Sequence, residues 1–171
     1  NDIKEFTLKL NNVNYELPTL LSCNFENTIN CDDGETGTSV ETTYQSGKFG
    51  NGILVDNIRT PSTGDRLYWP SANNINLNEG TIMFWYKPQD IWDSGTLEKM
   101  LFDARNTATP FNGLRILKLK PSSNEILAQL LTTSGGNDIR FPITNPTYFK
   151  QQDWNHIALA YGGGTFEVFA N

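Results

Sequence analysis

The stretch Gly80-Thr81-Ile82-Met83-Phe84-Trp85-Tyr86-Lys87-Pro88 decides the fold class of this chain. Its apolar run, residues 82–86, lies between a glycine on one side and Lys87-Pro88 on the other. The run is too short to span a membrane as a helix, and Ile, Phe, Trp and Tyr favour the pleated backbone. Since proline cannot donate to a sheet ladder, pairing should end at Pro88. The stretch therefore predicts a β-strand.

Successive side chains of a strand point to opposite faces of its sheet. Ile82, Phe84 and Tyr86 should face one way, and Met83 and Trp85 the other. Because both faces are apolar, we expect a central strand that a second sheet covers on at least one side. If Trp85 lies in the core, Trp85→Ala should cost about 3–5 kcal/mol.

Alternating apolar patterns bounded by turn signals recur along the whole chain, and no segment shows a convincing helical period. This pattern predicts an all-β sandwich of antiparallel sheets. The polar stretch 27–46 is expected to be a long loop. The expected strands cover residues 4–10, 13–17, 20–25, 52–56, 65–69, 80–87, 97–104, 114–120, 125–132, 139–143, 154–161 and 165–170.

The 80–88 stretch resembles the corresponding strand of the laminin-G-like and concanavalin A-like jelly rolls. Three further pieces resemble that family in the same order. They are Leu20-Leu21-Ser22-Cys23-Asn24-Phe25-Glu26, Gly47-Lys48-Phe49-Gly50-Asn51-Gly52-Ile53-Leu54-Val55-Asp56 and Asp153-Trp154-Asn155-His156-Ile157-Ala158-Leu159-Ala160-Tyr161.

The resemblance implies a concanavalin A-like jelly-roll sandwich of two antiparallel sheets over residues 19–171. Residues 1–18 are expected to form an N-terminal β-hairpin or the end of a preceding segment. Family members continue past the last strand seen here. We therefore expect a C-terminally truncated jelly roll, either a piece of a longer protein or one whose sheet another segment completes.

The charge of the chain and the length of its apolar runs limit the functions it could have. The chain has 171 residues, with 13 basic and 19 acidic side chains and a formal net charge of −6. This balance argues against binding nucleic acid through its phosphates. No apolar run reaches membrane length, so membrane insertion is not expected.

Cys23 and Cys31 are the only cysteines. They could close a small loop by a disulfide worth about 2–3 kcal/mol, or they could be two unpaired small apolar residues. The sequence leaves both readings open.

Hydrolysis on this fold would need carboxylates grouped on one strand, in the Glu-x-Asp-x-x-Glu manner of the glucanases that resemble the fold. No such triplet occurs, and Glu98 and Asp103 lie five positions apart, on opposite faces of one strand. His156 has no accompanying nucleophile motif and is interpreted as a packing residue. The expected protein is therefore not an enzyme.

The acidic segment with Asp32, Asp33 and Glu35 offers the oxygen ligands that Ca²⁺ prefers. The family resemblance implies a structural calcium ion beside this loop. The alternative is a solvated acidic turn.

Sugar recognition needs aromatic platforms and planar polar groups. Trp92 and Tyr148 lie in or beside predicted loops, and Asp103, Arg105 and Arg115 could supply polar partners. Trp92 is surrounded by Asp, Ser and Gly, so it is expected at a recognition surface.

These observations predict a non-catalytic carbohydrate-binding or surface-adhesion module. Its partner would be a glycan or a surface protein, and its setting a larger extracellular, cell-surface or virion-surface polypeptide with further domains. The alternatives are a structural spacer or protein–protein interaction domain without a small ligand, and, less favoured, a glycan-active enzyme.

Overall fold

The structure is a computed structural model. It describes residues 8–10, 13–15, 19–56, 64–89, 98–106, 111–119, 125–133, 135–142, 149–150 and 152–171. These residues form strands and turns, and no helix occurs among them. Accordingly, the described part of the chain holds no helix with the length and apolar character needed to cross a membrane. The chain divides into two compact units, residues 1–45 with 51–70 and residues 46–50 with 71–171, which are described separately.

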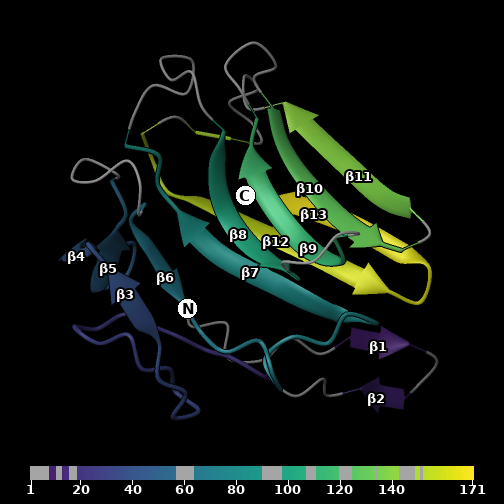
Figure 1. Ribbon diagram of the computed structural model, residues 1–171, viewed down its shortest axis with the longest axis horizontal. Helices are drawn as coiled ribbons and strands as arrows, with labels where there is room; N and C mark the ends of the chain where they lie inside the picture. The colour runs from purple at the N-terminus through teal and green to yellow at the C-terminus, as the bar shows by residue number, and fades with distance from the viewer. Residues whose placement is uncertain are drawn as a thin grey trace. The chain divides into compact units, whose positions relative to one another are not determined.

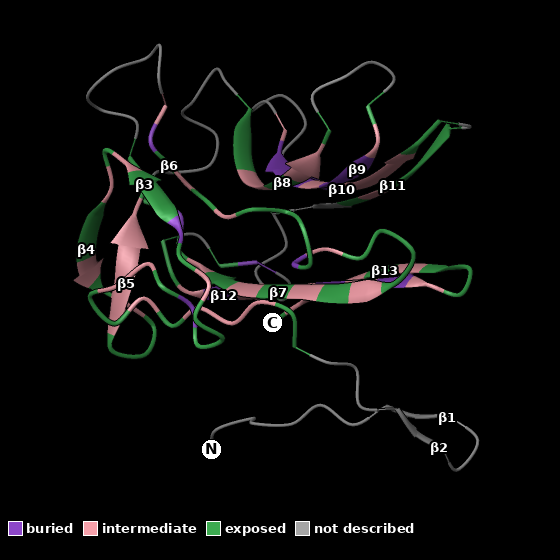
Figure 2. Cartoon of the chain, turned by 60° about the horizontal axis from the view of Figure 1, so that its bottom comes forward, coloured by how far each residue is buried: buried purple, intermediate pink, exposed green. Residues whose placement is uncertain are grey.

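The second unit contains two antiparallel sheets, which form two layers in Figures 1 and 2. One sheet has four strands in the order β11-β10-β9-β8, and the other has three in the order β13-β12-β7. Their bounds are β7 (Gly80–Tyr86), β8 (Lys99–Arg105), β9 (Gly113–Lys118), β10 (Glu125–Thr132), β11 (Gly135–Pro142), β12 (Asn155–Gly162) and β13 (Thr165–Ala170). The all-β, antiparallel prediction is confirmed, while the jelly-roll topology stays a prediction.

A single apolar cluster fills the space between these two sheets. Its fully buried members come from both layers, with Leu114, Ile116, Ile126 and Ala128 on one sheet and Ile157 and Leu159 on the other. Phe149 and Tyr161 complete the buried set. The alternation in the sequence explains this arrangement, because every second residue of each strand points into the shared interior.

One face of strand β7 packs against the core, and the other face is exposed. Ile82, Phe84 and Tyr86 pack against the core cluster, whereas Met83 is 53% exposed and Trp85 is 41% exposed. Figure 2 shows this alternation along β7. The expectation that Trp85 lies in the core was therefore wrong. An aromatic run favours a strand whichever way its side chains point, so composition could not show that only one face would be covered.

The first unit is built from short two-stranded sheets. In the N-terminal region, β1 (Leu8–Leu10) pairs antiparallel with β2 (Val13–Tyr15). The other pairs are β3 (Thr38–Val40) with β6 (Arg66–Tyr68), and β4 (Thr43–Ser46) with β5 (Asn51–Leu54).

Two predictions for the first unit were wrong. Residues 20–25, expected to form a strand, carry no strand. Phe25 and Asn27 both have φ of 58°, a left-handed conformation that interrupts an extended chain. The expected loop 27–46 instead contains β3 and β4. These strands have only three and four residues and a polar sequence, so they lack the long alternation that predicts a strand.

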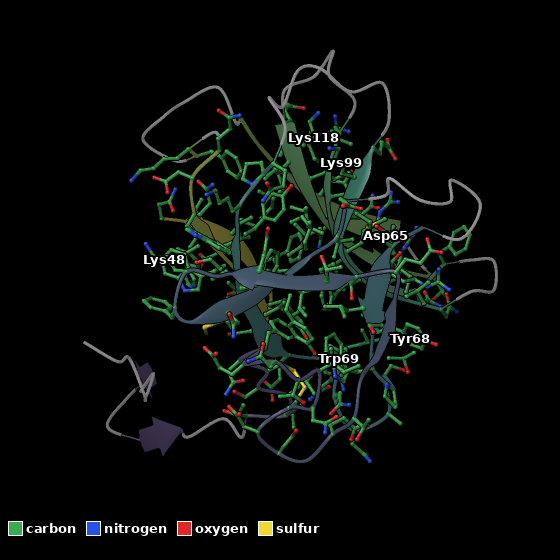
Figure 3. The ribbon with its side chains drawn as sticks, turned by 90° about the vertical axis from the view of Figure 1, so that its left-hand side faces the viewer. Lys48, Asp65, Tyr68, Trp69, Lys99 and Lys118 are labelled. Carbon is green, nitrogen blue, oxygen red and sulfur yellow. A yellow bond between two sulfur atoms is a disulfide. The ribbon has the colours of Figure 1, made fainter. Side chains whose placement is uncertain are left out.

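Cys23 and Cys31 form a disulfide, which settles the question that the sequence left open. The ring of Trp69 lies 6.0 Å from that of Phe25, and its Nε1 donates to the Ile29 carbonyl at 3.2 Å. Figure 3 shows the disulfide and Trp69 among the side chains of the chain. The disulfide loop and this indole together order a segment that has no strand of its own.

Removing the disulfide should destabilise the first unit. For a loop closed across eight positions, the double variant Cys23→Ser, Cys31→Ser should lose about 2.5 kcal/mol, because the unfolded chain gains conformational freedom. Urea unfolding of the variant and of the parent chain, without reductant, measures the difference. An unchanged transition midpoint would contradict the expected contribution.

Candidate functional site

A row of polar side chains crosses the outer face of the four-stranded sheet. In the strand register, Asp103 of β8 pairs with Arg115 of β9, Arg115 pairs with Gln129 of β10, and Gln129 pairs with Asp138 of β11. The flanking residues Leu114, Ile116 and Ala128 belong to the core cluster, so the row must lie on the opposite face. Together with Arg105, these four residues are called the polar row.

Hydrogen bonds join the members of the polar row into two groups, Asp103 with Arg105, and Arg115 with Gln129 and Asp138. Arg105 donates two hydrogen bonds to Asp103, from Nε to Oδ1 at 2.8 Å and from Nη2 to Oδ2 at 2.6 Å. Arg115 Nε donates to Gln129 Oε1 at 2.6 Å, and Gln129 Nε2 donates to Asp138 Oδ1 at 2.7 Å. These bonds hold planar side chains from all four strands in fixed positions.

The ion pair between Asp103 and Arg105 shifts the pKa of both side chains. Burial alone would raise the pKa of Asp103, but hydrogen bonds from Arg105 and the charges of Arg105 and Arg115 outweigh it, so the pKa lies below its ordinary value. The hydrogen bond to Asp103 raises the pKa of Arg105. A lowered carboxyl pKa stabilises the folded state above the unfolded value of about 3.9, and this contribution is lost as pH falls through the folded value.

Several polar atoms of the row have no hydrogen-bond partner among the described residues. Among the described residues, neither the Nη groups of Arg115 nor Oδ2 of Asp138 has a hydrogen-bond partner. The ring of Phe111, 46% exposed, lies 5.5 Å from the Arg105 guanidinium. The row therefore offers free donors and a free acceptor, with an aromatic ring beside Arg105.

The structure brings three of the five predicted ligand-binding residues together. Asp103, Arg105 and Arg115 all belong to the polar row, whereas Trp92 and Tyr148 lie outside the described residues. That Trp92 and Tyr148 take part in binding stays a prediction.

Sequence reasoning missed Gln129, Asp138 and Phe111. Gln129 carried a usable signal, because it is the single polar residue in the apolar run Ile-Leu-Ala-Gln-Leu-Leu of residues 126–131. Asp138 lies just outside the predicted strand 139–143, but β11 already begins at Gly135. Nothing in the local sequence indicated that Phe111 would lie near Arg105.

Two carboxylates of the acidic segment in the first unit already accept hydrogen bonds from nearby residues. Asp32 accepts hydrogen bonds from Ser22 Oγ at 2.9 Å and Asn24 Nδ2 at 3.3 Å. Asp33 Oδ1 accepts from the backbone N–H of Glu35 at 3.2 Å. The described residues include no group of three acidic, His or Cys side chains placed to hold a metal ion. These bonds favour a solvated turn.

The calcium site itself stays a prediction. Binding would raise the melting temperature by mass action, about 2.7 kcal/mol at a hundredfold excess over Kd. Melting curves recorded with Ca²⁺ and with chelator separate the two readings.

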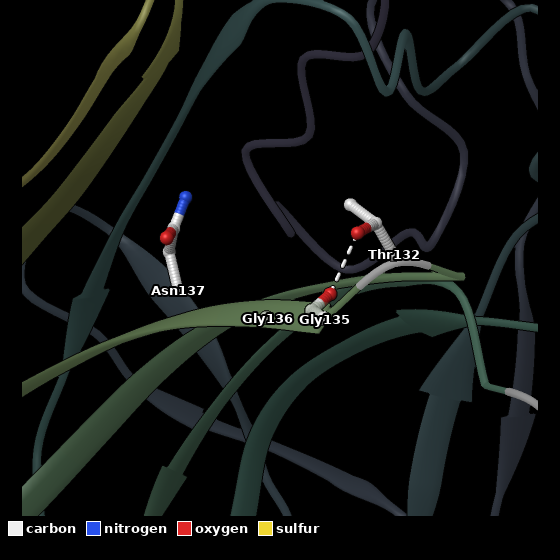
Figure 4. A pocket seen from close by; sticks show the side chains of 4 residues that line it. All are labelled: Thr132, Gly135, Gly136 and Asn137. Atoms are coloured by element: carbon white, nitrogen blue, oxygen red, sulfur yellow. Dashed lines mark hydrogen bonds between the residues drawn. The ribbon is translucent and has the colours of Figure 1, made fainter.

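A polar depression of about 310 Å³ lies at the β10–β11 turn, where Thr132, Gly135, Gly136 and Asn137 line it (Figure 4). The Thr132 hydroxyl donates to the Gly135 carbonyl at 2.6 Å. These lining residues include no charged or aromatic side chain. The depression therefore offers fewer recognition groups than the polar row, whose Asp138 directly follows Asn137.

No family model, no curated protein and no solved structure matches this chain. Membership of the laminin-G-like and concanavalin A-like group thus rests on the sequence resemblance and stays a prediction.

Proposed function

We propose that the polar row binds carbohydrate, and that the chain is a non-catalytic carbohydrate-binding or surface-adhesion module with a jelly-roll fold. One observation carries this proposal: planar polar side chains from four adjacent strands stand side by side on an outer sheet face, where hydrogen bonds hold them in two groups, Asp103 with Arg105 and Arg115 with Gln129 and Asp138.

The chemistry of the row suits sugar hydroxyl groups. A hydroxyl both donates and accepts, so it can use the Arg115 guanidinium and the Asp138 carboxylate. Hydrogen bonds to ionised groups are the stronger ones, and hydrogen bonds within the row already fix these groups before a ligand arrives. Phe111 adds an exposed ring that can contact the apolar face of a pyranose.

The spacing of the carboxylates supports binding rather than hydrolysis. Asp103 and Asp138 stand on β8 and β11, three strand spacings apart, which corresponds to about 14 Å. Paired glycosidase carboxylates lie only about 5–9.5 Å apart. The bidentate bond from Arg105 also holds Asp103 ionised, so this carboxyl is poorly suited to act as a general acid.

The disulfide supports the proposed location. Disulfides persist in oxidising compartments, so Cys23–Cys31 fits an extracellular, cell-surface or virion-surface setting. We place the module within a larger polypeptide that also carries other domains.

A protein–protein interaction domain remains the second candidate function. Exposed apolar side chains on the three-stranded sheet favour it, since large apolar patches on a protein surface usually mark interaction sites.

Truncating the row should abolish glycan binding without unfolding the protein. On a glycan array, Arg115→Ala and Gln129→Ala should lower the signal of the best-bound glycan at least about tenfold, because each loses charge-assisted or network hydrogen bonds. Arg140→Ala is the matched control, since Arg140 is an exposed β11 residue that pairs with Glu125 outside the row. All three variants should melt near the parent temperature.

Two results would contradict the proposal. One is a parent chain that binds no glycan on the array. The other is an array profile that is the same for the parent chain, Arg115→Ala and Gln129→Ala.

A further inference from the structure

The outer face of the three-stranded sheet is apolar in its middle. Across the sheet, Met83 of β7 pairs with Ala158 of β12, and Ala158 pairs with Phe169 of β13. Their neighbours Ile82, Ile157 and Val168 pack in the core cluster, so this triplet must point away from it. Met83 is 53% exposed and Phe169 is 55% exposed.

An aromatic group extends this apolar strip at one end. The ring of Trp85 lies 5.0 Å from that of His156 and 5.7 Å from that of Phe49, which is 69% exposed. Lys48 Nζ stands over the Trp85 ring, 5.0 Å from its centroid. Because three side chains already surround the indole, it is poorly placed to stack on a sugar ring. A flat apolar strip with an ordered aromatic end is better suited to another protein surface.

This face carries an acidic side chain at one end and basic side chains at the other. Glu167 points outward at one end, beside the pair of Ala160 and Thr81. Lys48 and Lys87 lie at the other end, near Trp85. Among the described residues, none of these three charged side chains forms an ion pair. The face thus carries an unpaired acid, an apolar centre and unpaired bases, in that order.

Such an arrangement is complementary to itself. A two-fold axis lying in the plane of contact and passing close to Ala158 would place the acidic end of one copy over the basic end of the other. Both apolar centres would be buried together, as an isologous interface requires. Since the chain has a net charge of −6, two copies repel each other at most orientations, and this pairing is one that offsets the repulsion.

We propose that the outer face of the three-stranded sheet is a homodimer interface, with Glu167 of each copy facing Lys48 and Lys87 of its partner. The occupant of the face is a second copy of this chain. This inference does not depend on carbohydrate binding, because the polar row lies on the other sheet.

Sedimentation of the purified chain over a concentration series tests the interface. The parent chain should form a dimer, and Glu167→Lys should raise the dimer Kd at least about tenfold, since like charges then face each other. Adding Lys48→Glu and Lys87→Glu to Glu167→Lys should restore the dimer. Glu98→Lys, a charge reversal at an exposed residue just before β8, should leave the dimer unchanged.

A parent chain that stays monomeric at all concentrations would overturn the proposal and leave the face to a different partner. Met83→Asp buries a charge in the apolar centre, so a dimer that survives this change must use another surface. A dimer that survives Glu167→Lys would overturn the charge pairing. Circular dichroism of each variant checks that the fold is retained, because all the altered side chains are exposed.

Discussion

Replacing Leu159 by alanine should lower the free energy of unfolding by about 2–5 kcal/mol. Leu159 has no exposed surface and lies in the middle of β12, within the cluster that joins the two sheets. The truncation loses the transfer free energy of the removed carbons and leaves a cavity that a close-packed interior fills poorly. Urea unfolding followed by tryptophan fluorescence measures the loss.

Leu77→Ala is the matched control, because it removes the same atoms from a side chain that is 46% exposed. It should change stability by no more than about 0.5 kcal/mol. Equal effects of the two substitutions would mean that the sheets do not enclose Leu159.

Asn155→Ala should cost about 2–4 kcal/mol, since it leaves several polar groups without their partner. The Asn155 side chain is fully buried at the start of β12. Its Oδ1 accepts from the Lys150 N–H at 2.6 Å and from Asn171 Nδ2 at 3.1 Å. Its Nδ2 donates to the carbonyls of Lys150 and Asp153, each at 2.8 Å. One amide therefore satisfies the N–H and the carbonyl of Lys150 and the carbonyl of Asp153.

Asn155→Asp separates the hydrogen bonds from the shape of the side chain. It keeps the volume and the acceptor but replaces the donor with a charge, so it should destabilise the protein even though nothing is truncated. Asn137→Ala, at an exposed asparagine of β11, should be nearly neutral. A thermal midpoint for Asn155→Ala equal to that of Asn137→Ala would contradict the assigned role.

Periodicity allowed much of the second unit to be predicted. The predicted strands 80–87, 125–132, 154–161 and 165–170 agree with β7, β10, β12 and β13 to within one residue at each end. These strands are long, and their alternating side chains enter one common core, so the local pattern and the tertiary packing agree.

Three features could not be predicted, each for a physical reason. The short strands β3 and β4 are too brief to show a period. The absence of a strand at residues 20–25 depends on left-handed residues and a disulfide, whose pairing the sequence left open. The exposure of Trp85 depends on which face of a sheet another layer covers, and a run that is apolar on both faces cannot reveal this.

The candidate site could be predicted only in part. Alternation along the predicted strand 114–120 places Arg115 on the face opposite Leu114 and Ile116, and the structure agrees. Its neighbours across the sheet depend on strand register, which is a non-local property set by pairing and not by the sequence of one strand. Gln129 and Asp138 therefore became members of the row only when the pairings of β9, β10 and β11 were known.

The two proposed surfaces are compatible with each other. The polar row lies on the four-stranded sheet and the dimer face on the three-stranded sheet, so each is on the outer side of the sandwich formed by the second unit. A dimer formed through the three-stranded sheet would therefore not cover the polar row of either copy. If the polar row binds carbohydrate as proposed, the two sites of a dimer would gain avidity on a glycan-coated surface.

The most direct test of carbohydrate binding by the polar row is an amide NMR titration of the intact chain with the oligosaccharide that gives the strongest array signal. The largest shift changes should fall on Asp103, Arg105, Arg115, Gln129 and Asp138, with smaller ones at Phe111. The Arg115→Ala variant should show no saturable change over the same range. Saturable shifts confined to other residues, or the same titration in the parent chain and in Arg115→Ala, would contradict the proposed site.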